Sequence, residues 1–152
     1  MTNRKVVERF MRALVDNDFD AQDALIHPDY LDHYPQSGEV IRGVANRRAI
    51  VESYPGRAEA GVAVSSERVS GAGEQWLPSP HPLGWGITHI GGANDEFTTA
   101  GTVRYPNGET WHIVALFTVR DGKIWRQTTY FAPPFEPPEW RAPYTEQRPA
   151  SD

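Results

Sequence analysis

The spacing of hydrophobic and polar residues changes once along this chain, close to residue 60. Before that point apolar residues recur at helical spacing, and the pattern predicts a long amphipathic helix over residues 3 to 17. Two shorter helices are predicted over residues 20 to 26 and 44 to 54. After that point alternating and continuous apolar runs predict β-strands. Helices followed by strands in this order indicate an α+β fold.

The clearest strand signals lie in the second half of the chain. Residues 97 to 105 and 110 to 119 read as strands, and residues 117 to 131 read as a hairpin closed by Asp121-Gly122. Residues 110 to 119 are apolar at both alternating positions. Both faces of that strand are therefore expected to be covered, one by helices and the other by a pocket or a second subunit.

The end of the chain differs in composition from the rest. Residues 133 to 152 contain six prolines, too many for regular secondary structure, yet Phe135, Trp140 and Tyr144 are costly to expose together. We therefore predict one domain over residues 1 to 132 and a Pro-rich tail that packs on it. Whether the tail closes a cavity or reaches a partner subunit is left open by the sequence.

Composition and charge exclude several classes of function. The net charge of −5 argues against a nucleic-acid-binding surface, and the absence of cysteine rules out disulfides and thiolate metal sites. No apolar run approaches about 18 residues, and the N-terminus lacks the apolar segment of a signal peptide. We expect a cytoplasmic protein whose partner is a small apolar molecule, without nucleic acid or membrane.

The hairpin of residues 117 to 131 resembles the last hairpin of the SnoaL-like branch of the nuclear transport factor 2 superfamily. The resemblance covers most of residues 5 to 131 and implies a cone, in which a curved antiparallel sheet wraps around N-terminal helices and encloses an apolar cavity. Many catalytic members carry a carboxylate five residues past the Ile of Asp-Gly-Lys-Ile. That position is Thr129 here, so the usual acid–base group is replaced.

A second resemblance concerns residues 29 to 35, which are similar to the segment of ketosteroid isomerases that carries their catalytic Asp. An ungapped match places His33 at that position. Histidine can act as a base near neutral pH, so the match makes His33 the candidate catalytic residue. A structural role for His33, a hydrogen bond to a loop carbonyl, has about equal weight. The same match puts Met11 where these enzymes have a hydrogen-bond-donating Tyr, and methionine cannot donate.

Side-chain alternation then selects the residues that would contact a ligand. If Thr129 faces the cavity, Gln127 and Phe131 share its face, and parity on the neighbouring strand adds two more positions. With the two tyrosines beside His33, the expected substrate-binding residues are Tyr30, Tyr34, Trp111, Ile113, Gln127, Thr129 and Phe131.

Two specific site types are disfavoured by what the sequence lacks. Limonene epoxide hydrolases share the hairpin but also need an Arg and an Asp two residues apart on the preceding strand. Residues 97 to 105 have no acidic residue. His33, His89 and His112 have no local ligand spacing, so we expect no metal ion and no other cofactor.

Three functions remain for such a chain. The first is a SnoaL-like enzyme, a cyclase, isomerase or dehydratase acting on an apolar polyketide-like or polycyclic substrate. The second is a non-catalytic protein that holds a hydrophobic ligand in the same cavity. The third is a structural protein whose sheet face serves only to dimerise. A homodimer through the face opposite the cavity is expected in any case, because residues 110 to 119 would otherwise leave an apolar face wet.

Overall fold

A computed structural model describes residues 1–57, 86–91 and 94–148 of the chain. The predicted α+β fold is confirmed, with the helices in the N-terminal part of the chain, but two strands lie between the second and the third helix. The elements are α1 Asn3–Val15, α2 Phe19–Ala24, β1 Ile26–Tyr34, β2 Glu39–Arg42, α3 Gly43–Glu52, β3 Gly86–Gly91, β4 Glu96–Arg104, β5 Thr110–Arg120, β6 Lys123–Ala132 and a 3₁₀ helix η1 Glu139–Tyr144. The side chain of His89, one of the three histidines considered for a metal, lies outside the described residues.

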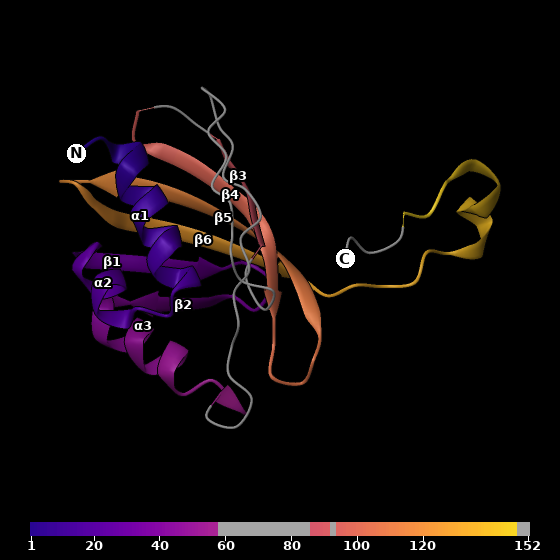
Figure 1. The fold of residues 1–152 in the computed structure, drawn as a ribbon, viewed down its shortest axis with the longest axis horizontal. Coiled ribbons are helices and arrows are strands. Elements are labelled where there is room, and N and C mark those ends of the chain that lie inside the picture. Colours follow the sequence, from indigo (N-terminus) through magenta and orange to yellow (C-terminus); the bar gives the residue numbers. More distant parts are fainter. Residues whose placement is uncertain (58–85, 92–93, 149–152) are drawn as a thin grey trace.

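Helix α1 forms where the sequence predicts it and supplies one side of the core. The Thr2 hydroxyl accepts a hydrogen bond from the Lys5 backbone N–H at 3.4 Å and caps the helix start. Its apolar stripe is fully buried against the concave side of a curved sheet (Figure 1). The ring of Phe10 meets that of Phe117 on β5 edge to face, with centroids 5.9 Å apart. Helix and sheet thus share one core.

Within the described residues the sheet has six strands, in the order β2-β1-β6-β5-β4-β3. The predicted antiparallel pairing holds for all neighbours except β1 and β6, which run parallel. Parallel neighbours need a long crossover connection, and here the chain from β2 to β5 provides it. This pairing brings residues 95 positions apart in the sequence side by side, with Asp32 opposite Gln127.

The outer face of the sheet carries apolar side chains that this single chain does not cover. On β5 the buried positions alternate with exposed ones, and Val114 and Leu116 are 38% and 42% exposed. Tyr130 of β6 stands opposite Val114 and is 42% exposed. We call these three side chains the outer apolar patch. The patch is the face through which we expect a homodimer to form.

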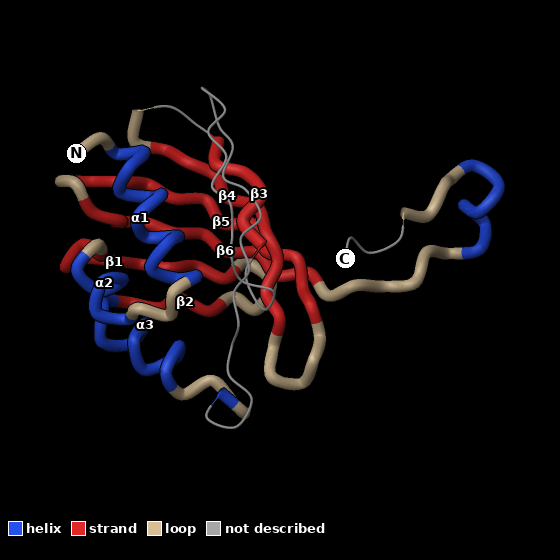
Figure 2. Tube along the Cα trace, in the orientation of Figure 1, coloured by secondary structure: helices blue, strands red, loops and turns tan. Residues whose placement is uncertain are grey.

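The Pro-rich tail leaves the end of β6 and extends away from the domain (Figures 1 and 2). Phe135, Trp140 and Tyr144 are 80%, 73% and 83% exposed. Within this single chain the three rings therefore do not pack on the domain, and their contact with a partner subunit stays a prediction. Prolines hold the backbone extended, as at Pro138 with φ −67° and ψ 139°, and carry the chain outward from the sheet end.

No helix in the described part of the chain is long and apolar enough to cross a bilayer.

Candidate functional site

A cavity of about 220 Å³ lies between α1, α3 and the concave side of the sheet. Apolar and aromatic side chains form most of its wall, with a few polar groups among them, as is usual for small-molecule sites. Its apolar and aromatic residues are Phe10, Leu14, Phe19, Tyr34, Ile41, Ile50, Val51, Tyr54, Val103, Tyr105 and Phe131. Its polar residues are Asn17, Gln22, Asp32, Arg47, Arg57, Gln127 and Thr129.

Asp32 is the only carboxyl group among these cavity residues, and it is 4% exposed. Burial raises its pKa from 3.8 to about 7, because the charged form loses water. The hydrogen bond from Thr129 and the positive charge of Arg47 act in the opposite direction and lower it. The result is a carboxyl group that can take up or release a proton near neutral pH.

A chain of side-chain hydrogen bonds ends at this carboxyl. The Tyr30 hydroxyl donates to Gln127 Oε1 at 2.9 Å, and Gln127 Nε2 donates to Thr129 Oγ1 at 2.9 Å. Thr129 then donates its own hydroxyl proton to Asp32 Oδ1 at 3.0 Å. Each donor is fixed by the one before it, so the chain holds Asp32 in one orientation and points its dipoles toward it.

The structure places Asp32, and not His33, on the cavity side of β1. Successive side chains of a strand point to opposite faces, so Tyr30, Asp32 and Tyr34 share the inner face and His33 does not. His33 stands opposite Val40 and Thr128 and does not line the cavity. Our assignment of His33 came from an ungapped match, in which a shift of one residue exchanges the two faces. The alternation itself already pairs the two tyrosines with Asp32.

Most of the expected substrate-binding residues meet at the cavity. Tyr34, Gln127, Thr129 and Phe131 line it, and the ring of Tyr34 packs edge to face on Phe131 with centroids 5.1 Å apart. Tyr30 is buried behind them and holds Gln127.

Trp111 and Ile113, also expected to bind substrate, do not line the cavity. Ile113 is buried in the core, while Trp111 packs on Tyr105 and donates to Glu109 at 2.9 Å. Both still share the inner face of β5, where their cross-strand partners Val103 and Phe131 line the cavity.

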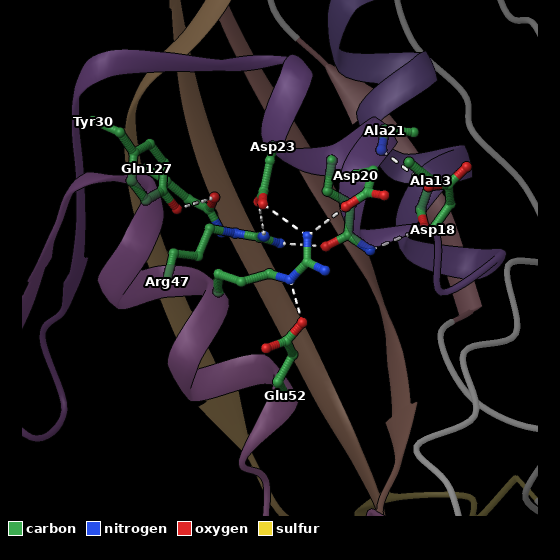
Figure 3. A network of polar contacts seen from close by, with 11 residues as sticks. Ala13, Asp18, Asp20, Ala21, Asp23, Tyr30, Arg47, Glu52 and Gln127 are labelled. Atoms are coloured by element: carbon green, nitrogen blue, oxygen red, sulfur yellow. Dashed lines mark hydrogen bonds and ion pairs between the residues drawn. The ribbon is translucent and has the colours of Figure 1, made fainter.

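Sequence reasoning missed Arg47, a buried cation in the cavity wall. Only 6% of it is exposed, its Nη2 donates to Gln22 Oε1 at 2.8 Å, and its guanidinium lies 5.1 Å from the centroid of the Phe10 ring. Gln22 in turn donates to the carbonyl of Ala13 at 3.0 Å (Figure 3). Arg47 and Arg48 are neighbours on a short helix, where arginines are usually exposed to solvent. No local feature of the sequence therefore marked Arg47 as buried.

Among the residues that the structure describes, no group of three or more histidines and carboxylates is arranged to hold a metal ion.

Comparison with known proteins gives a consistent picture of the fold. The profile of the SnoaL-like domain family matches residues 7–127. An NTF-2 like protein of unknown function from Burkholderia xenovorans LB400 is 28% identical, with a TM-score of 0.70 over 97% of this chain and 95% of that one. A proposed ketosteroid isomerase from Kribbella flavida DSM 17836 is 20% identical, with a TM-score of 0.73 over 97% and 90%. An LEH-like epoxide hydrolase from M. tuberculosis is 22% identical, with a TM-score of 0.59 over 85% and 81%. No curated protein matches the chain significantly.

Proposed function

We propose, from the premise that the chain belongs to the SnoaL-like domain family, that it is an enzyme of isomerase type that moves a proton within an apolar small molecule. Asp32 is the acid–base group of this proposal. The cavity, the hydrogen-bond chain and the buried carboxyl each contribute, but the pKa of Asp32 near neutrality carries the proposal.

The chemistry follows from this pKa. A catalytic base works best when its pKa lies close to the operating pH, because the ionised form is then abundant and still basic. In a β,γ-unsaturated ketone, Asp32 removes a proton from the α-carbon, and the C–H electron pair moves toward the carbonyl to give a dienolate. Return of that proton from Asp32 to the γ-carbon shifts the C=C bond into conjugation with the carbonyl and gives the isomer.

The groups around Asp32 suit this role. Thr129, Gln127 and Tyr30 keep one carboxyl oxygen fixed, so the carboxyl is held ready for the substrate. Tyr34 lines the cavity, and burial raises the pKa of its hydroxyl, which keeps it a neutral hydrogen-bond donor. The likeness to a proposed ketosteroid isomerase, at 20% identity, shows the shared fold and is compatible with this reaction type.

A simple carbon acid provides the test. In D₂O near neutral pH, the protein should catalyse exchange of the α-protons of 2-tetralone, a bicyclic ketone, followed by proton NMR. A ketone of this kind has the acidic C–H and the apolar body that the site requires. Binding of 2-tetralone without any exchange above the buffer rate would contradict the enzyme proposal.

That outcome would favour the second candidate, a protein that binds a hydrophobic ligand without reaction. The observation in its support is that the family carboxylate position is occupied by Thr129, which is no useful acid or base. Under that reading Asp32 only hydrogen-bonds the ligand.

We also infer that the protein is a homodimer joined through the outer apolar patch. Patches of this kind, rimmed by polar residues, commonly mark interfaces, and the exposed rings of the tail give a partner further apolar surface to bury. Light scattering at micromolar concentration should give twice the chain mass of 17.1 kDa. Replacing Leu116 by Lys should shift the protein to monomer, with Lys123→Ala as a control outside the patch. A monomeric wild type would overturn the inference.

A further inference from the structure

The charged groups next to the cavity are paired unevenly. Asp20 and Asp23 each approach Arg48 Nη1 at 2.9 Å, and Glu52 accepts from Arg48 Nε (Figure 3). Three carboxylates therefore converge on one arginine. That arginine does not line the cavity.

Arg47 precedes Arg48 in the sequence and does line the cavity, but it has much weaker pairing with carboxylates. Among the described residues its nearest carboxylate oxygen is Asp23 Oδ1, 3.9 Å from Nη1, which is too long for a hydrogen bond. Nη1 is buried and has no hydrogen-bond partner among the described residues, and the same holds for Asp23 Oδ1. A buried cation is normally paired and hydrogen-bonded, because its desolvation is otherwise costly.

The second arginine of the wall differs in its partners. Arg57 donates to the amide oxygen of Asn17 at 2.8 Å and lies 4.8 Å from the centroid of the Phe19 ring. Arg57 is partly buried, and this desolvation lowers its pKa. Among the described lining residues, two cations thus lie on the helical side of the cavity and one carboxyl group, that of Asp32, lies on the sheet side.

We propose that Arg47 recognises a carboxylate on the ligand, so that the substrate is an apolar ring compound carrying one carboxylic acid group. This proposal rests on the proposed function, in which the substrate atom that reacts lies at Asp32. What it adds is the chemical class of the substrate. The ligand carboxylate accepts from the guanidinium of Arg47, and the apolar body lies against Phe10, Leu14 and Val103. A contact of Arg47 with the ligand would not leave Asp23 without a cation, because Asp23 has a 2.9 Å ion pair with Arg48.

Three compounds of one shape test this recognition: 2-naphthoate, the neutral 2-naphthamide, and naphthalene. Affinities are measured by isothermal titration calorimetry. The wild type should bind 2-naphthoate at least about tenfold more tightly than 2-naphthamide, since a charge-assisted hydrogen bond is replaced by a neutral one. In Arg47→Met this preference should disappear. Arg57→Met is the matched control, because it removes the other cavity arginine, and it should keep the preference.

Further variants keep the test decisive. If Arg47→Met does not fold, Arg47→Lys retains the charge but loses the planar fork, and the preference should shrink without vanishing. Asp32→Asn should keep the preference for 2-naphthoate while losing proton exchange, so failure of the proposed reaction and failure of carboxylate recognition are distinguishable. Equal affinity of the wild type for 2-naphthoate and 2-naphthamide would overturn the proposal. So would a preference lost in Arg57→Met but kept in Arg47→Met.

Discussion

Replacing Asp32 by asparagine is expected to lower the rate of α-proton exchange in 2-tetralone by at least about 100-fold, which is typical for loss of a general base. Asparagine has nearly the same shape and still accepts the Thr129 hydroxyl proton, but it cannot take up a proton. The wild-type rate should rise with pH and level off above about pH 7, following the pKa of Asp32. The measurement is the exchange rate by NMR from about pH 5 to pH 9.

The matched control for this experiment is His33→Ala on the same strand. His33 does not line the cavity, so the variant should keep both the exchange rate and the pH dependence. Loss of the pH dependence in His33→Ala, with a normal profile in Asp32→Asn, would restore the assignment that the sequence match favours. Thr129→Val, which removes the hydroxyl that holds Asp32, should raise the pH at which the rate levels off, because that hydrogen bond lowers the Asp32 pKa.

The second expected effect of Asp32→Asn is to stabilise the folded protein at alkaline pH. The pKa of Asp32 is 3.8 as a model value and about 7 when folded, so between these values the folded state binds more protons than the unfolded state. Under that condition the free energy of unfolding falls as pH rises. The contribution of Asp32 is fully present below about pH 4 and is lost by the time the pH passes 7. Three pKa units correspond to up to about 4 kcal/mol.

Urea unfolding of the wild type and Asp32→Asn at several pH values measures this effect. The free energy of unfolding of Asp32→Asn, relative to that of the wild type, should increase between about pH 4 and pH 8 by up to about 4 kcal/mol. A surface control is Asp121→Asn, whose side chain is largely exposed and should show no such change. A constant difference across this pH range would mean that Asp32 is ionised normally in the folded protein. Gain of stability on loss of a reactive group is the expected trade-off at an active site.

The sequence by itself determined the features that depend on neighbouring residues. The apolar spacing of residues 3 to 17 predicted α1, because a helix repeats every 3.6 residues. Asp121-Gly122 predicted the last hairpin, since both residues adopt the positive φ that this turn needs, 52° and 70°. The position of Thr129 and Gln127 in the cavity wall followed from alternation along one strand.

Tertiary structure alone decided the chemistry of the site. The parallel pairing of β1 with β6 brings Asp32 to Thr129, so the carboxyl group missing at position 129 is supplied by the neighbouring strand. The raised pKa of Asp32 and the incomplete pairing of Arg47 arise from burial, which depends on every element that closes the cavity. The tail shows the same limit, because its aromatic residues indicate apolar contacts but not whose surface they meet. Side-chain periodicity acts within one element, whereas burial and ion pairing sum contributions from residues far apart in the chain.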